Sequence, residues 1–283
     1  MADWNTVITE RSFPRFRSSV SCGLALALTL AVAGCGTHMR GSVPPGTSEP
    51  DKFLFDKGTD ALNAKKWLTA REFFKQVTET YTQSPYRPDA KLGIGDTYLG
   101  EGTAEALVLA INEFREFLSF YPTNRRADYA QYKLGMSHFR QMRAAQRDQT
   151  ETREALKEFE AFVARYPNSS LMPEVKAKLR ETRDRLSESD YLVGYFYFRQ
   201  RWYIGAIDRF KALLKEDPEY TGRDAVFYHL AESLARMRGR EAEALPYFEQ
   251  LVKEFEQSEY LPLAQKRITE LKTQAVTKTS GGS

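Results

Sequence analysis

An alanine followed four residues later by phenylalanine occurs in five related copies along this 283-residue chain and constrains its fold more than any other feature. An aromatic residue or an aspartate follows seven positions after each phenylalanine, and proline comes next in the middle three copies. A spacing of four places the small residue and the ring on one face of a helix, where a neighbouring helix can approach closely. The copies are Ala70/Phe74/Tyr81, Ala110/Phe114/Tyr121, Ala155/Phe159/Tyr166, Ala206/Phe210/Asp217 and Ala244/Phe248/Phe255.

A second helical pattern with a small residue precedes each copy, which predicts five helical hairpins. These small residues are Gly58, Gly95, Gly135, Gly194 and Ala231. In the first and fourth copies the small residue and the alanine are 12 residues apart, the spacing of a tetratricopeptide repeat. The phenylalanines are 40, 45, 51 and 38 residues apart, more than the 34 residues of the standard unit, so the connections are longer. We expect an all-α, tetratricopeptide-repeat-like superhelix of five hairpins over residues 51–275.

Three further segments complete the expected domain. No strong helix breaker falls between Pro173 and Gln200, so residues 170–200 are expected to form one long helix, or two in line, ahead of the fourth hairpin. The polar connection 140–153 is either a contact surface or a solvated loop. A helix from Leu261 to about Gln274 is expected to cap the array, followed by a disordered tail over residues 276–283.

The first 34 residues have the pattern of a lipoprotein signal peptide. Three arginines precede an apolar run of 11 residues, Gly23 to Ala33, which is shorter than the roughly 20 residues that span a bilayer. The run ends in Val-Ala-Gly-Cys, a lipobox whose Cys35 takes the lipid. A plain secretory signal with an incidental cysteine is the alternative. In the proteobacterial lipoprotein pattern, aspartate after the cysteine favours the inner membrane, so Gly36 implies the outer membrane.

The next segment, residues 35–50, combines the acylated cysteine with a flexible tether rich in Gly, Pro and Ser. The other cysteine, Cys22, lies within the segment to be removed, so the mature protein has no disulfide. The whole chain has a formal net charge of only +3, and removal of the leader leaves it near neutral. This balance argues against nucleic acid as the main partner, because such binding requires a concentrated basic surface.

Sequence motifs for catalysis are absent: the chain has no Gly-rich phosphate loop, no His-Glu-x-x-His, no Gly-x-Ser-x-Gly and no cysteine pair. His38 lies in the tether, and His138 and His229 lie on expected helices without a second ligand at metal-site spacing. Carboxylates such as Glu158/Glu160 and Glu181/Asp184 lie among basic residues and are expected to form solvated ion pairs. We therefore expect no enzyme activity, no cofactor and no metal.

Residues 153–220 resemble the BamD family, also called ComL, of outer-membrane lipoproteins in the β-barrel assembly machinery. The most specific part runs from Tyr191 through an aromatic-rich segment into the turn Arg199-Gln-Arg-Trp202. The resemblance covers the lipobox, the five repeats and the inserted helix, although Asp217-Pro218 replaces the usual Tyr-Pro. It implies a periplasm-facing scaffold for barrel assembly whose partners are an Omp85-type (BamA-like) subunit, other lipoproteins of the machinery and unfolded outer-membrane proteins.

The same resemblance places partner binding in the C-terminal repeats and substrate binding in the N-terminal repeats. A basic residue on the second helix of the fourth repeat faces the barrel subunit in the family, which corresponds to Arg209, with Arg201 and Trp202 in the preceding turn. An exposed, ion-pairing arginine is the alternative for Arg209. Tyr98 and Tyr132 are candidates to line a peptide groove, or else pack inside their hairpins. A tetratricopeptide lipoprotein that pilots a secretin or coordinates Tol-Pal and peptidoglycan is the alternative function.

Overall fold

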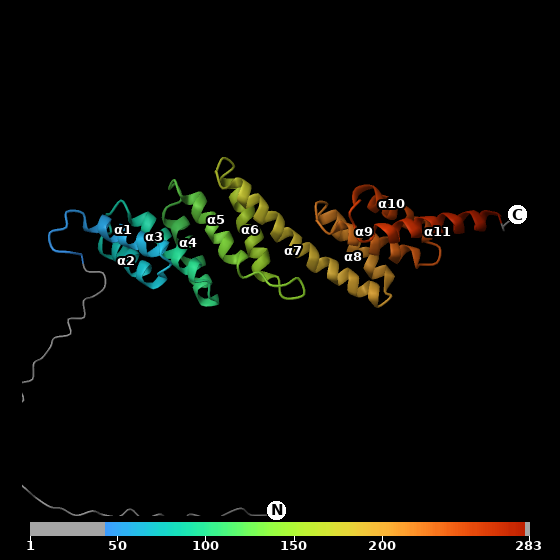
Figure 1. The fold of residues 1–283 in the computed structure, drawn as a ribbon, viewed down its shortest axis with the longest axis horizontal. Coiled ribbons are helices and arrows are strands. Elements are labelled where there is room, and N and C mark those ends of the chain that lie inside the picture. The colour runs from blue at the N-terminus through green and yellow to red at the C-terminus, as the bar shows by residue number, and fades with distance from the viewer. Residues whose placement is uncertain (1–42, 281–283) are drawn as a thin grey trace, which may run out of the picture. The chain divides into compact units, whose positions relative to one another are not determined.

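The computed structural model describes residues 43–280, with side chains through Thr277, and this part of the chain is helical throughout its regular elements. Successive helices pack against each other as hairpins (Figure 1). The elements are α1 (Pro50–Asn63), α2 (Trp67–Thr80), α3 (Arg87–Glu101), α4 (Ala104–Phe120), α5 (Ala127–Phe139), α6 (Thr150–Arg165), α7 (Met172–Arg199), α8 (Tyr203–Glu216), α9 (Arg223–Ala235), the 3-10 turn η1 (Glu241–Ala244), α10 (Leu245–Glu254) and α11 (Leu261–Ser280).

The alanine and phenylalanine pattern forms the core of every hairpin, which confirms the predicted repeats. All five alanines are completely buried, and the five phenylalanines are at most 1% exposed. In four hairpins the glycine of the first helix lies directly against the ring of the second. A Cβ placed on Gly58 or Gly194 would be 2.7 or 2.6 Å from the ring of Phe74 or Phe210. Because backbone and ring are in contact there, a larger residue would force the two helices apart.

The predicted long helix is confirmed as α7, which has 28 residues and contacts α6 near its start and α8 near its end (Figure 1). Three clusters of buried side chains divide the interior. One joins α1 to α5, one joins α5, α6 and the beginning of α7, and one joins the end of α7 to α11. The middle of α7 is rich in arginine and carboxylate side chains, so the joint between the second and third clusters is polar.

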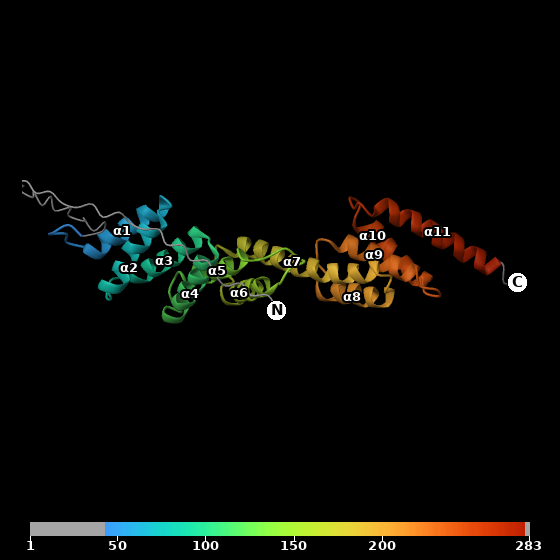
Figure 2. The same cartoon turned by 90° about the horizontal axis from the view of Figure 1, so that it is seen from below.

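The C-terminal helix α11 packs against α10 through Ala264 and Leu271. It continues to Ser280, beyond the end expected near Gln274, and Figure 2 shows its last turns extending past the hairpin. Residues 272–277 are all exposed. The expected signal peptide 1–34, Cys35 and most of the tether lie outside the described residues. None of the helices in the described range is long and apolar enough to cross a bilayer.

Candidate partner-binding surfaces

The turn between α7 and α8 carries a group of exposed apolar side chains, here called the apolar patch. Its members and their exposed fractions are Val193 (40%), Phe196 (53%), Trp202 (58%) and Ile204 (63%). The rings of Phe196 and Trp202 are in edge contact, with centroids 6.2 Å apart. Clustered exposed apolar side chains of this size are typical of surfaces that bind another protein.

Of the two basic residues expected at the partner surface, Arg201 adjoins this patch in the turn and Arg209 lies farther along α8. Arg201 is exposed and has a φ of 61°, so a residue with a side chain occupies the left-handed conformation in the turn. Arg209 is exposed on α8. Burial and Glu216 raise the pKa of Asp190 on α7, whereas Arg153 and Arg209 act in the opposite direction. Arg209 is thus close enough to α7 to influence Asp190 while its guanidinium stays accessible. The structure therefore places Arg201 and Trp202 in the turn at one end of the fourth hairpin, whereas Arg209 lies halfway along α8.

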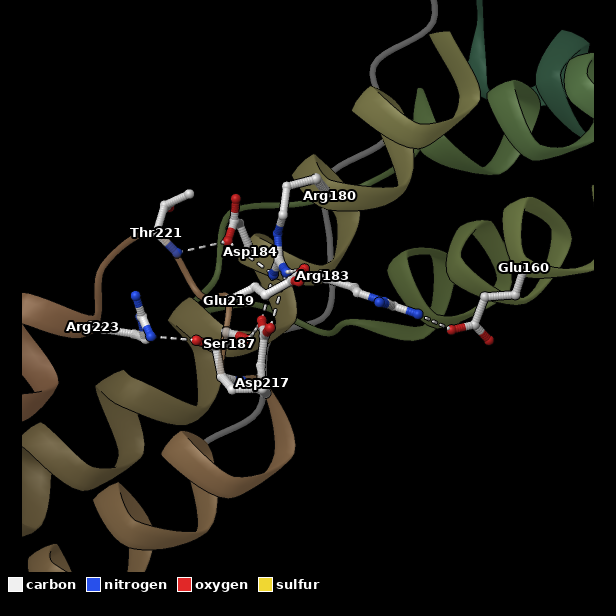
Figure 3. A network of polar contacts seen from close by, with 10 residues as sticks. Glu160, Arg180, Arg183, Asp184, Ser187, Asp217, Glu219, Thr221 and Arg223 are labelled. Carbon is white, nitrogen blue, oxygen red and sulfur yellow. Dashed lines mark hydrogen bonds and ion pairs between the residues drawn. The ribbon is translucent and has the colours of Figure 1, made fainter. Parts of the chain in front are cut away.

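A polar network fixes the middle of α7 to the loop after α8 (Figure 3). Arg180 donates a 2.9 Å hydrogen bond to one oxygen of Asp217 and a second, shorter bond to the other oxygen, and it forms a 3.0 Å ion pair with Asp184. Ser187 donates to Asp217 at 2.6 Å. Burial opposes ionisation of Asp217, but the bonds from Arg180 and Ser187 outweigh it and hold its pKa below the ordinary value. The aspartate that replaces the usual tyrosine therefore anchors α8 to α7.

Two further arginines of the same segment tie it to the third hairpin. Arg183 donates to Glu160 on α6 at 2.8 Å, and Arg185 donates to the carbonyl oxygen of Arg143 at 2.7 Å. Between α6, α7 and α8 lies a pocket of about 570 Å³ with a partly apolar wall formed by Leu156, Leu186 and Leu213. Its other lining residues include four carboxylates besides Glu160, so the pocket is acidic.

The two candidate groove tyrosines are both buried. Tyr98 is 9% exposed, and the guanidinium of Arg71 lies 3.7 Å above its ring centroid. Tyr132 is 6% exposed and donates a 2.5 Å hydrogen bond to Glu174, and burial together with this bond raises its pKa. Neither ring has a face open to solvent, because both rings pack against neighbouring residues of the repeats.

A pocket of about 440 Å³ nevertheless lies next to Tyr132, between the first turn and the helices α3 and α5. Tyr129 donates to both oxygens of Asp96 there, at 2.9 and 2.8 Å, and burial raises the pKa of Asp96. The lining residues are Leu62, Asn63, Lys65, Trp67, Asp96, Leu99, Gly100, Tyr129, Tyr132, Lys133, Met136 and Arg140. Apart from Tyr132, the residues that line this pocket are not among the groove candidates from the sequence, because their exposure depends on the neighbouring hairpin.

The polar connection between α5 and α6 is more ordered than a solvated loop. Ala145 and Gln149 are buried, and the side-chain amide of Gln149 donates to the carbonyl oxygens of Ala144 and Arg147, both at 2.9 Å. Arg140 donates to the carbonyl oxygen of Leu99 on the preceding hairpin. The connection is therefore part of the packed structure.

The two histidines in the described part of the chain have different surroundings. His229 on α9 lies among the rings of Tyr195, Phe198 and Tyr228, and burial lowers its pKa. His229 is therefore a packed residue of the core. His138 on α5 instead lies close to carboxylates of α6.

Comparison with known proteins identifies the family. The profile of the YfiO family, described as an outer membrane lipoprotein, matches residues 47–238. The chain belongs to this family. A tetratricopeptide-repeat profile also matches residues 225–258, which contain α9 and α10.

Curated relatives of this YfiO-family chain are called outer membrane protein assembly factor BamD. The protein of Caulobacter vibrioides is 28% identical over 210 residues, which cover 74% of this chain and 68% of that protein. The protein of Vibrio cholerae is 27% identical over 206 residues, covering 69% and 81% of the two chains. That of Rickettsia prowazekii is 23% identical over 222 residues, covering 78% and 86%. The resemblance inferred from the sequence is thereby confirmed.

Proposed function

We propose that this chain is a non-enzymatic scaffold of the β-barrel assembly machinery, held at the periplasmic face of the outer membrane by lipid on Cys35. In this role it binds an Omp85-type barrel subunit together with other lipoproteins of the machinery and helps barrel proteins to assemble and insert. The observation that carries the proposal is the apolar patch beside Arg201, with the exposed Arg209 farther along α8, on a family member whose curated relatives are named assembly factors.

The composition of this surface suits a stable protein contact. Trp and Arg are enriched among the residues that dominate binding energy, and they act best when a partner excludes water around them. Trp202 supplies a large apolar area, and Arg209 supplies a charge that an acidic partner residue can pair with. The acidic pocket between α6, α7 and α8 shares Asp190 with the Arg209 side of α7, so it extends this surface along the helix.

Substrate binding is assigned to the N-terminal hairpins. The pocket beside Tyr132 combines apolar walls with Lys133 and Arg140, a mixture that suits an extended peptide ending in an aromatic residue and a carboxylate. Unfolded barrel proteins end in strands with aromatic residues. Photocrosslinkers near Tyr98 and Tyr132 should therefore capture C-terminal barrel peptides, whereas crosslinkers near Arg209 should capture the barrel subunit.

Co-purification with the barrel subunit tests the docking proposal. Ile204→Asp should reduce recovery of the Omp85-type subunit, because a carboxylate would be buried against the partner. Leu68→Asp is a matched control. Leu68, like Ile204, is the second residue of its helix, and it is 65% exposed. Arg209→Glu should weaken docking without unfolding the protein, because it removes and reverses a surface charge. Undiminished recovery with both Ile204→Asp and Arg209→Glu would contradict the assignment.

Recovery of a secretin, or of Tol-Pal components, in place of the barrel subunit would instead support the alternative function. The anchor is tested separately by Cys35→Ser, which should leave the protein soluble or uncleaved. Each buried methylene contributes about 0.8 kcal/mol to membrane binding, so several acyl chains hold a protein firmly. Mass spectrometry of the mature membrane-bound protein should show lipid on Cys35, and an unmodified cysteine there would contradict the anchor.

A further inference from the structure

The side chain of His138 is held in an arrangement that leaves one ring nitrogen available. The side chain is only 7% exposed, and Nδ1 lies 2.8 Å from Oε2 of Glu151. An ionised carboxylate only accepts hydrogen bonds, so with a neutral imidazole Nδ1 carries the proton and donates it. Nε2, on the other edge of the ring, then has a lone pair, and it is buried without a hydrogen-bond partner. Leaving such an acceptor unsatisfied is unfavourable.

Two carboxylates of α6 lie within reach of this histidine. His138, Glu154 and Glu158 each offer one ligand atom, and these three atoms all lie within 4.8 Å of one another. Because Nδ1 is engaged by Glu151, Nε2 is the histidine atom free to act as a ligand. Zinc holds nitrogen and oxygen donors at about 2.0–2.2 Å, so these atoms need to close by only about an ångström to surround an ion.

The surroundings of these residues also resemble the outer shell of a metal site. Metal-bound histidines usually donate their other ring N–H to a carboxylate, which fixes the ring, and Glu151 fulfils that role. Glu158 is oriented by Gln131, which is 1% exposed and donates to Oε2 at 2.6 Å. Glu154 has a distant ion pair with Lys157 at 3.7 Å, and both side chains are exposed. Glu158 thus departs from the solvated ion pair expected from the sequence.

We propose that His138, Glu154 and Glu158 form a binding site for a divalent transition-metal ion of the zinc type, which links α5 to α6. One imidazole and two carboxylates supply three ligands and leave a fourth position for water. The site stabilises the α5–α6 hairpin, which has the longest connection between its two helices in the described part of the chain. This hairpin also contains the smallest of the three core clusters described there, with five buried residues.

Metal titration of the full-length protein in detergent, after removal of metal with a chelator, tests the site. Co²⁺ should bind with one equivalent and develop visible absorption bands of a low-coordinate site, and Zn²⁺ should displace it. Zn²⁺ should also raise the thermal unfolding midpoint. His138→Gln should weaken binding at least 100-fold, and Glu154→Gln at least tenfold. Glu151→Gln should cost about 10–100-fold, the range typical of outer-shell partners.

Glu160→Gln is the matched control, because Glu160 lies on the same helix but is exposed and pairs with Arg183 on α7. This variant should bind metal like the wild type. Glu154 is 39% exposed, so Glu154→Gln should fold normally even if replacing the buried histidine perturbs the hairpin. Absence of a one-equivalent site in the wild type, or affinity unchanged in His138→Gln and Glu154→Gln, would overturn the proposal.

Discussion

The first and fourth hairpins share one backbone design but present different surfaces at their turns. Their glycines, alanines and phenylalanines are equivalent, at positions 136 residues apart, and the turn residue in the left-handed conformation is Lys65 in one and Arg201 in the other. Three exposed charged positions of the first hairpin are apolar in the fourth. The substitutions are Lys57 to Val193, Asp60 to Phe196 and Lys66 to Trp202.

The shared residues are those that the fold requires, and the residues that differ lie on the surface of the turn, where the fold does not require them. Trp67, in the first hairpin, lies so close to the next hairpin that a Cβ on Gly100 would be 2.7 Å from its ring. Trp202 is 58% exposed, so its ring contributes little to the fold. Phe196 and Trp202 occupy positions that are charged in the first hairpin. Exposed aromatic side chains are unfavourable for solubility unless a partner covers them. We therefore propose that docking uses the fourth hairpin and not the first.

The shared core should make both hairpins equally sensitive to loss of their phenylalanine. Phe74→Ala and Phe210→Ala should each reduce the free energy of unfolding by about 3–5 kcal/mol, because each ring fills the space against a glycine of the facing helix. Chemical denaturation of the two variants measures the effect. A loss below about 1 kcal/mol in either variant would mean that the repeat equivalence is wrong.

Exchanging the surface residues should separate binding from stability. Replacing Phe196 with Asp and Trp202 with Lys gives the fourth hairpin the residues of the first, and should weaken binding of the barrel subunit by about 2 kcal/mol or more. The unfolding free energy should change by only about 0.5 kcal/mol, because both side chains are exposed. Binding can be measured by calorimetry with the periplasmic part of the partner.

The reverse exchange is the matched control for that experiment. Asp60→Phe with Lys66→Trp places the apolar pair on the first hairpin, where no docking is expected, so affinity for the barrel subunit should stay at the wild-type value. An equal loss of affinity in both exchanged proteins would remove the distinction between the two turns.

Asp217 supplies a difference in pH dependence, because it occupies the position of Tyr81 in the first hairpin. Its pKa is lower in the folded chain than its ordinary 3.8, so its stabilisation is complete above about pH 4 and is lost as the pH falls through the folded-state pKa. Asp217→Asn should cost about 1.5–3 kcal/mol at pH 7, as for hydrogen bonds to charged groups. The difference from the wild type should shrink below pH 4, which acid denaturation series can measure. A difference independent of pH would contradict the role of the Arg180 network.

The smallest expected effect concerns the strained turn residues. Lys65→Gly and Arg201→Gly should each stabilise the protein by about 0.5–1 kcal/mol, because glycine adopts a positive φ without steric cost. Thermal unfolding measures both. Arg201→Gly should also reduce affinity for the barrel subunit, whereas Lys65→Gly should not.

Local spacing was sufficient to predict the architecture. The glycine, alanine and phenylalanine positions and the single long helix follow from helical periodicity and from the absence of breakers, and the structure confirms them. The sequence could not predict which residues of the segment Tyr195 to Phe198 are exposed. All four residues are aromatic, so periodicity does not indicate which side faces solvent.

Contacts between helices were the main feature that the sequence could not supply. The carboxylates near His138 come from the next helix, across a long connection, so ligand spacing along the chain gave no signal. Burial of Tyr98 depends on Arg71 from the preceding hairpin. The extent of α11 was underestimated because residues 272–277 are all exposed, so hydrophobic periodicity ends before the helix does.

Site-specific photocrosslinking in cells tests the division between the two turns most directly. A photoreactive residue would be placed at positions 196 and 202, and in matched chains at positions 60 and 66. We predict that the first pair captures the Omp85-type barrel subunit and that the second pair does not. Capture of that subunit with equal yield at both turns, or at positions 60 and 66 alone, would contradict it.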